Sequence, residues 1–481
     1  MAQAGVLPTI IQGGMGVGVS NWRLANAVAS CGQLGVVSGT GLDTLFVRRL
    51  ADGDPGGHLR CAMAQFPVPD IADRIIARYF REGGLAEGEP YPLLAMYRQR
   101  MDRARHQLTA LANFVEVWLA KDGHGGLVGI NLLAKIQLPN LASLYGAMLA
   151  GVDYVLMGAG IPREIPGVLD RLRYHLPVET TFDVAGLPKG ETETVAFDPV
   201  VIGAVAPTDL KRPAFLPVVA SNSLATAMAR KANGSVEGFV IEGPTAGGHN
   251  APPRGARQHN ARGEPVYGER DRVDLTKIAE LGVPFWVAGG AGHPDRLSEA
   301  REAGAAGVQV GTLFAYCRES GLTESHRRRV LLAAANGGVD VLTEDNASPT
   351  GFPFKTIQLE GTLAATDVYE RRERRCDLGY LRAAYRTSSG RVDYRCPAEP
   401  VDTFVKKGGD ATATVGRKCL CNALMANVGH GQVVDGVTVE PALFTAGDDL
   451  RSIGTFLASR TSYSAADVID YLLAGTAPRM E

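Results

Sequence analysis

The residues best suited to chemistry in this sequence lie in residues 238–254, which read GFVIEGPTAGGHNAPPR. Residues 239–241 form a short apolar run typical of a buried strand, and the loop after it carries Gly247, Gly248 and His249. Paired glycines let a backbone approach a ligand closely, and histidine has a pKa suited to proton transfer near neutral pH. A flexible loop whose histidine has no function would show the same pattern. The other motifs of the chain are needed to choose between the two interpretations.

Two other glycine-rich strand ends suit a bound anion. Gly289 and Gly290, with Ala291 and Gly292, follow one apolar run, and Gly311-Thr312 follows the next. Turns of this kind at the start of helices present backbone N–H groups to a phosphate, and the helix dipole adds to the attraction. Tight turns alone would also need glycine here, but a phosphorylated cofactor or substrate explains both positions better.

Small or polar residues also occur at other strand ends. They are residues 13–15, Ser38, Asn131 and Ser221-Asn222. Asn131 interrupts an otherwise apolar strand, where a buried amide must find hydrogen-bond partners in a ligand or in a neighbouring loop. No nucleophile elbow, Walker motif or triad of metal ligands accompanies these residues, so the sequence predicts a site built around a cofactor.

Eight short apolar runs, most of them followed by a helical pattern, must position these residues. They lie at residues 8–12, 34–38, 127–132, 153–157, 215–220, 239–241, 284–288 and 307–310. Their alternation predicts a (β/α)₈ TIM barrel of the α/β class, whose functional loops follow the carboxyl ends of the strands. A doubly wound dinucleotide-binding sheet is disfavoured, because Asn21 stands where its fingerprint needs a third glycine after Gly16 and Gly18.

The chain has 481 residues, which is enough for two or three domains. We expect residues 1–345 to form the barrel domain, with a helical insertion at about 53–122. Residues 346–481 lack the alternation of strand and helix patterns, and we expect them to form a C-terminal α-rich extension or a small second domain. The polar stretch at 177–213 is expected to form a hairpin or a lid.

The composition is that of a soluble enzyme. Hydrophobic residues make up 45% and charged residues 21%, and the net charge of −2 offers no basic surface to nucleic acid or to an anionic membrane. The N-terminus lacks the pattern of a signal peptide, and no uncharged apolar stretch is long enough to span a bilayer. Seven cysteines in such a chain favour a reducing cytoplasm. We expect a cytoplasmic protein with a small-molecule substrate.

Four of the cysteines, Cys376, Cys396, Cys419 and Cys421, fall in the last quarter of the chain. Four thiolates can hold zinc or an iron–sulfur cluster. The spacing lacks the paired C-x₂-C motifs typical of such sites, and buried free thiols are the alternative. The sequence leaves both interpretations open.

Five motifs occur in an order that resembles the nitronate monooxygenase (2-nitropropane dioxygenase-like) flavoproteins. They are PTIIQGGMG from Pro8, GINLL from Gly129, AGGH from Ala246, AGGAG from Ala288 and GVQVGT from Gly307. The resemblance covers roughly residues 6–340 and implies an FMN-binding barrel. The same superfamily includes FMN-dependent enoyl-acyl carrier protein reductases and the trans-acting enoyl reductases of polyketide and polyunsaturated fatty acid synthases.

The resemblance also implies roles for individual residues, with His249 as the catalytic residue near the reactive face of the flavin. The cofactor-binding residues that it implies are Gly14, Met15, Asn131, Ser221, Gly243, Gly248, Gly289, Gly290, Gly311 and Thr312. Gly14 and Met15 would contact the flavin ring, and the last four would hold the phosphate. The chain departs from many relatives at Thr245, where they carry an acidic residue.

The activity that the resemblance implies is oxidation of alkyl nitronates or nitroalkanes by dioxygen, which gives a carbonyl compound and nitrite. His249 would abstract the proton next to the nitro group or orient the nitronate. The alternative is an FMN- and NAD(P)H-dependent enoyl-acyl carrier protein reductase, with acyl carrier protein as a partner. A catalytically silent flavin- or phosphate-binding scaffold is the third interpretation. A homodimer is the expected assembly.

Overall fold

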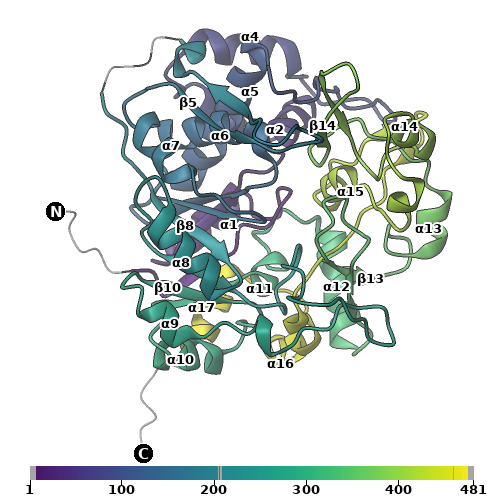
Figure 1. Cartoon of the computed structure of the whole chain (residues 1–481). Coiled ribbons are helices and arrows are strands. Elements are labelled where there is room, and N and C mark those ends of the chain that lie inside the picture. The colour runs from purple at the N-terminus through teal and green to yellow at the C-terminus, as the bar shows by residue number, and fades with distance from the viewer. Residues whose placement is uncertain (1–6, 204, 206–207, 459, 475–481) are drawn as a thin grey trace, which may run out of the picture.

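The computed structural model describes residues 7–203, 205, 208–458 and 460–474, and its centre is a barrel of parallel strands (Figure 1). The eight strands are β1 (Ile10–Gln12), β2 (Gly35–Ser38), β3 (Val128–Leu133), β4 (Tyr154–Gly158), β8 (Ala214–Val219), β9 (Phe239–Glu242), β10 (Phe285–Ala288) and β11 (Gly307–Val310). They pair in the order β1-β11-β10-β9-β8-β4-β3-β2. Ile11 and Leu34 form a parallel bridge between the two end strands, so the sheet closes. The predicted TIM barrel is confirmed, strand by strand.

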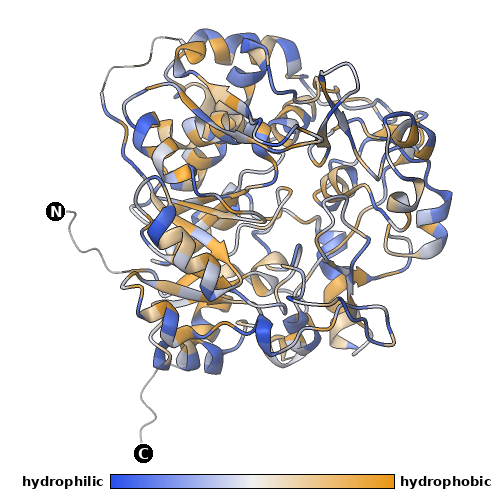
Figure 2. Ribbon diagram, in the orientation of Figure 1, coloured by the Kyte–Doolittle hydropathy of each residue, from blue (hydrophilic) through white to orange (hydrophobic). Residues whose placement is uncertain are grey.

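Helices surround the barrel. Those between successive strands are α1 (Trp22–Ser30), α5 (Arg103–Lys121), α6 (Gln137–Leu149), α7 (Ile165–Leu172), α8 (Asn222–Lys231), α9 (Leu275–Ala279) and α10 (Pro294–Glu302). α17 (Ala465–Ala474) packs against α1, α10 and the short α11 (Thr312–Ala315), so the end of the chain covers the remaining gap. Figure 2 shows apolar residues along the strands and polar residues on the outward helix faces. This distribution is expected where the strands pack against the inward faces of the helices.

Additional helices precede α5 in the chain. They are α2 (Leu42–Ala51), α3 (His58–Met63) and α4 (Pro69–Tyr79). All three pack against α5, and α5 itself packs against α1 and α6 as part of the helical layer of the barrel. The stretch at 177–213 contains the predicted hairpin, in which β5 (Val178–Phe182) pairs antiparallel with β7 (Glu193–Phe197).

The C-terminal region (residues 346–458 and 460–474) lies across the carboxyl ends of the strands. The expected helices are present as α13 (Thr366–Arg371), α15 (Leu420–Asn427) and α17, together with α14 (Val401–Lys406) and α16 (Ile453–Leu457). Short strands that were not predicted accompany them: β13 (Phe354–Gln358), β14 (Ala383–Arg386), β15 (Val392–Arg395), β16 (Val433–Val434) and β17 (Thr438–Val439). β13 pairs antiparallel with β12 (Asp340–Glu344), which follows α12 (Glu324–Ala335). β14 pairs with β6 (Val184–Ala185) beside the hairpin.

None of the helices in the described residues is long and apolar enough to cross a membrane.

A buried polar network joins the C-terminal region to the helices that follow β2. The Asp43 carboxylate forms an ion pair with Arg105 at 2.6 Å and accepts hydrogen bonds from Tyr97, at 2.5 Å, and from Tyr380. The Tyr380 hydroxyl also lies 2.7 Å from the Thr44 hydroxyl. Because a buried carboxylate is costly without partners, this arrangement fixes Tyr380, and with it the C-terminal region, over the barrel.

Replacing Asp43 with Ala should therefore lower the free energy of unfolding by about 3–5 kcal/mol, because the Arg105 guanidinium would stay buried without its counter-ion. Urea and thermal unfolding followed by circular dichroism measure the change. Asp367→Ala is the matched control, since Asp367 pairs with Arg371 at 2.6 Å on an exposed helix face and should contribute less than about 1 kcal/mol. Equal effects of the two substitutions would contradict this role of the network.

Candidate active site

A cavity of about 260 Å³ lies at the carboxyl ends of the barrel strands. Side chains alternate along a strand, and the inward residues one layer deeper form the apolar barrel core, which includes Val36, Leu156 and Val240. An inward-facing residue near the end of each of seven strands lines the cavity floor: Ser38, Asn131, Gly158, Val218, Glu242, Ala288 and Gln309. Four of these seven side chains are polar, so the floor offers hydrogen-bonding groups above an apolar core.

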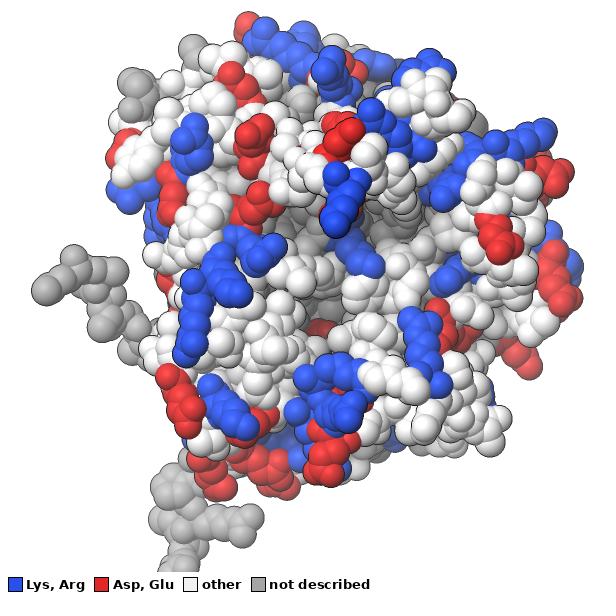
Figure 3. Space-filling model, viewed as in Figure 1, with Lys and Arg blue, Asp and Glu red and all other residues white. Residues whose placement is uncertain are grey.

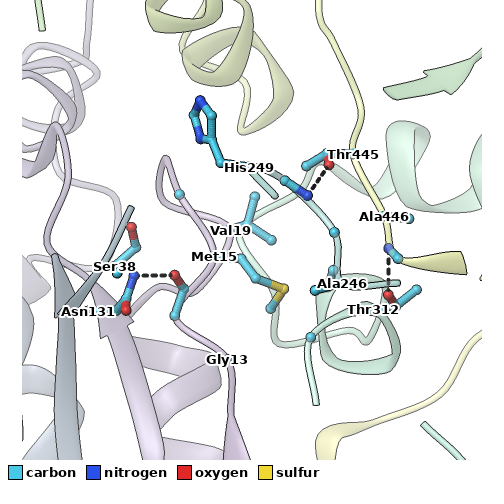
Figure 4. Close-up of a pocket in the computed structure, with 18 of the residues that line it drawn as sticks. Gly13, Met15, Val19, Ser38, Asn131, Ala246, His249, Thr312, Thr445 and Ala446 are labelled. Carbon is cyan, nitrogen blue, oxygen red and sulfur yellow. Dashed lines mark hydrogen bonds between the residues drawn. The ribbon is translucent and has the colours of Figure 1, made fainter. Parts of the chain in front are cut away.

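The loop after β1 forms one wall and is held by side chains of neighbouring elements. The Ser20 hydroxyl donates to the Gly13 carbonyl at 2.7 Å and accepts from the Met15 amide at 2.8 Å. Asn131 Nδ2 donates to the Gly14 carbonyl at 3.1 Å (Figure 4). A Cβ atom on Gly14 would lie 2.2 Å from the Cβ of Asn131, so only glycine fits. The Asn131 amide thus finds its partner in the neighbouring loop while it faces the cavity.

The two glycine-rich loops predicted to hold a phosphate form another part of the lining. Gly289 and Gly290 have φ angles of +93° and +64°, which favour glycine. The Thr312 hydroxyl accepts from the Gly447 amide at 3.0 Å, so the C-terminal region closes over this corner. Asp449 also lines it, and burial raises the pKa of its carboxyl group. The sequence analysis missed Asp449, because its position beside these loops depends on contacts across the chain.

The loop that carries His249 is paired with the C-terminal region through its backbone. The Lys355 amide donates to the Gly248 carbonyl at 2.9 Å, and the Asn250 amide donates to the Pro353 carbonyl at 2.9 Å. His249 and Phe354 thus face each other in an antiparallel bridge. The Gly248 amide donates to the Thr445 hydroxyl at 2.8 Å (Figure 4).

The imidazole of His249 borders the cavity, and Figure 4 shows it projecting away from Met15 and Thr312. Its Nε2 atom lies 2.7 Å from the Ser348 hydroxyl, and its ring packs against Phe354 with centroids 4.8 Å apart. Burial lowers the pKa of His249 to about 4, and the positive charge of Lys135 contributes in the same direction. The imidazole is therefore neutral at physiological pH.

Glu242 is a second ionisable group of the cavity that the sequence analysis did not single out. It is the last residue of β9, and burial raises its pKa to about 7. An acidic residue at an inward-facing strand end was the available signal, because a carboxyl group there faces the barrel axis. His249 and Glu242 thus have pKa values shifted in opposite directions, an arrangement common at functional sites.

Apolar residues of the C-terminal region form the roof. They are Leu381, Leu420, Leu424 and Phe444, with Tyr380 and Cys421 beside them. The roof was not predicted, since nothing in the local sequence of these residues indicates what they cover.

The structure brings most of the predicted site residues together. Those that line the cavity are Gly14, Met15, Asn131, Gly248, His249, Gly289, Gly290, Gly311 and Thr312. Ser221 does not reach it, because its hydroxyl caps α8 by accepting from the Leu224 amide at 3.2 Å. Gly243 lies just below the lining, where its amide donates to the Ala288 carbonyl at 3.0 Å. Both have structural roles at strand ends in this arrangement.

Comparison with known proteins adds to this geometry. Residues 195–344 match the model of a family described as nitronate monooxygenase. FabK from Thermotoga maritima has a similar structure, with a TM-score of 0.50 and 16% identity over 98% of this chain and 93% of that chain. A nitroalkane oxidase from Streptomyces ansochromogenes gives a TM-score of 0.45 and 16% identity, with 98% and 96% of the two chains covered. No curated protein matches the chain.

The matched residues include three of the five motifs, AGGH, AGGAG and GVQVGT, so this part of the chain is similar to the family that the motifs indicated. At 16% identity the likeness to FabK supports the barrel fold alone.

Replacing Gly14 with Ala should reduce the flavin bound per chain, because the new Cβ would displace either the loop or Asn131. Flavin absorbance relative to protein concentration measures this after purification. Gly268→Ala is the control, since a Cβ at Gly268 meets open space. A Gly14→Ala protein that keeps its full flavin content would show that this packing is not needed for the cofactor.

Proposed function

We propose that this protein is a flavin-dependent oxidoreductase of the nitronate monooxygenase family, which uses FMN to oxidise small alkyl nitronates with dioxygen to a carbonyl compound and nitrite. The observation that carries the proposal is the roofed cavity, in which apolar side chains of the C-terminal region cover the mouth of the barrel. An apolar roof over a floor with a few polar groups suits a small substrate bound beside the cofactor.

The residues present fit FMN. Gly289, Gly290, Gly311 and Thr312 would hold its phosphate, and Gly14 and Met15 would lie against the ring, all of them in the cavity lining. Gln309 also lines the cavity, and its buried Oε1 atom has no hydrogen-bond partner within the described residues, so it suits a hydroxyl or N–H group of a ligand.

Asp449 is an acidic group that lines the cavity beside the proposed phosphate position. Its Oδ1 atom is buried and has no hydrogen-bond partner among the described residues. Burial raises the pKa of its carboxyl group, and in the neutral form that group can donate a hydrogen bond to a phosphate oxygen. The protonated Asp449 side chain would therefore stabilise a bound phosphate, whereas its carboxylate form would repel it.

A bound flavin would supply the redox chemistry, accepting electrons from the nitronate and passing them to dioxygen. The protein's contribution at His249 is that of a neutral imidazole, since its pKa of about 4 makes it a weak base. Abstraction of a proton from a neutral nitroalkane would need a stronger base. A nitronate is already an anion, so a neutral imidazole need only donate a hydrogen bond that orients it.

Positive charge around the opening favours an anionic substrate. Figure 3 shows the face between the barrel and the C-terminal region hollowed near its centre, with Lys and Arg side chains around the hollow. The charge of Lys135 acts on His249, and its ammonium lies 3.5 Å from the centre of the Phe352 ring and 3.2 Å from the Thr350 carbonyl. Cations at an entrance raise the local concentration of anions and their rate of association.

The proposal is tested by anaerobic reduction of the bound flavin in a stopped-flow spectrometer, with propionate 3-nitronate, NADH and NADPH as separate reductants. We expect the nitronate to reduce the flavin fastest, because it fits under the roof and carries the charge that the entrance favours. Faster reduction by NADH or NADPH, with an enoyl thioester reoxidising the flavin, would replace the proposal by the enoyl reductase alternative. A preparation that binds no flavin would contradict both.

Glu242 should govern the pH dependence near neutrality. Its neutral form accommodates an anionic substrate, and its carboxylate, which forms as the pH rises through about 7, repels it. We therefore expect kcat/KM for a nitronate to fall as the pH rises through this range in the native protein and in His249→Asn. Glu242→Gln should abolish the fall. If kcat/KM for His249→Asn no longer falls as the pH rises, the titrating group is His249 and not Glu242.

A further inference from the structure

The four cysteines in the last quarter of the chain lie far apart in sequence, but they meet around one small hollow. Cys376 follows α13, Cys396 follows β15, and Cys419 and Cys421 lie at the start of α15. Within the described residues, no group of three or more His, Cys, Asp and Glu side chains is placed to hold a metal ion. The metal site, one of the two interpretations of these cysteines, is therefore disfavoured, and all four are free thiols.

Two of these thiols are in direct contact. The side chains of Cys376 and Cys396 form a hydrogen bond with each other at the hollow, whereas Cys419 Sγ lies 3.7 Å from Asn422 Nδ2. A disulfide requires two sulfur atoms to approach to about 2 Å, which is a short movement for side chains that already touch. Cys376 and Cys396 are thus the pair that the fold places for a disulfide.

Cys376 can also be reached from outside the protein. It is only partly buried, whereas Cys396 is 5% exposed. Of the four cysteines, Cys376 is the one that also lines a wider cleft of about 550 Å³. Glu373 and Asp435 line the same cleft and are exposed, so the cleft opens to solvent. A small oxidant therefore has access to Cys376 first.

The surroundings of Cys376 favour its thiolate, which is the reactive form of a thiol. The hydrogen bond from Cys396 and the charge of Arg382 lower the pKa of Cys376, although burial and the carboxylates of Glu399 and Asp377 oppose them. Arg382 also lines the cleft, and its guanidinium donates to two backbone carbonyls at 2.6 and 3.1 Å. Carbonyls carry no net charge, so they do not neutralise the arginine beside the thiol.

The other cysteines lack this combination of access and charge. Burial raises the pKa of Cys419 to about 11 and raises that of Cys421 as well, so both are neutral thiols at physiological pH. Cys31 is exposed, but its pKa is also raised. An oxidant that prefers a thiolate should therefore select Cys376.

We propose that Cys376 is a redox-sensitive thiol, which hydrogen peroxide oxidises to a reversible disulfide with Cys396. The Cys376 thiolate attacks one oxygen of the peroxide, the O–O bond breaks, and uptake of one proton gives a sulfenic acid and water. The Cys396 sulfur then attacks the Cys376 sulfur, the S–O bond breaks, and the thiol proton leaves with the hydroxyl group as a second water. Together the two thiols lose two electrons and two protons, and a dithiol reverses the reaction by exchange.

The disulfide would restrain part of the wall of the larger cavity. Tyr380 and Leu381 lie between the two cysteines in the chain, and both line that cavity. Leu381, Leu420 and Cys421 line the hollow as well as the cavity, so the two spaces share a wall. The modification itself does not rest on the proposed function, because neither Cys376 nor Cys396 lines the cavity.

The direct test is oxidation of the full-length protein with hydrogen peroxide, followed by alkylation of the remaining thiols and peptide mapping by mass spectrometry. We expect a cross-linked peptide that joins Cys376 to Cys396, and recovery of both thiols after treatment with dithiothreitol. A cross-link from Cys376 to Cys419 or Cys421 would overturn the proposal. Oxidation of other cysteines while Cys376 and Cys396 both stay reduced would overturn it as well.

Substitutions separate the roles of the two thiols. Cys396→Ser removes the second thiol, so the sulfenic acid at Cys376 should persist and react with dimedone, a reagent specific for sulfenic acids. Cys31→Ser and Cys61→Ser, at exposed thiols, are the matched controls and should keep the cross-link. Circular dichroism shows whether each variant is folded. A folded Cys396→Ser protein without a dimedone adduct at Cys376 would contradict the proposal, and the peptide map of the native protein decides if this variant does not fold.

Discussion

The backbone pairing between the His249 loop and β13 is the interaction on which the rest of the site depends. Two amide-to-carbonyl hydrogen bonds, from Lys355 to Gly248 and from Asn250 to Pro353, fix the loop against the C-terminal region. The paired glycines before His249 leave the backbone free to adopt this path, and Gly248 has a φ of +76°. The pairing places the imidazole beside Ser348 and Phe354 and turns an open barrel mouth into a covered cavity.

Covering the mouth determines the electrostatics beneath it. Removing water disfavours charge, so the same burial that keeps His249 neutral also favours the neutral form of Glu242 at its pKa of about 7. A site with few charges of its own and cations outside suits an anion that arrives already deprotonated. The Asp43 network helps to keep the mouth of the cavity covered, because Tyr380 takes part in that network and also lines the cavity.

The sequence was sufficient for the features that local patterns determine. Alternation of apolar runs and helical patterns located all eight strands, and the glycine-rich strand ends located several segments of the cavity lining. At Ser221, a polar residue at a strand end, the side chain caps the next helix, and its contact with a cofactor stays a prediction. Local sequence patterns gave no indication of the roof, of Asp449 or of α17 beside α1, because each depends on contacts between residues more than 100 positions apart. The cysteines illustrate the same limit, since their spacing is irregular and only the fold brings them to one hollow.

The central claim is that a covered cavity with a neutral histidine acts on the preformed anion. The measurement that tests it most directly is the ratio of kcat/KM for ethyl nitronate to kcat/KM for nitroethane at neutral pH, with nitrite release as the readout. Because the chain offers no strong base at His249, the ratio should reach about 10² or more, the scale of the rate that general base catalysis would otherwise contribute. Comparable values for the two substrates would show that the site abstracts the proton itself and would contradict the account.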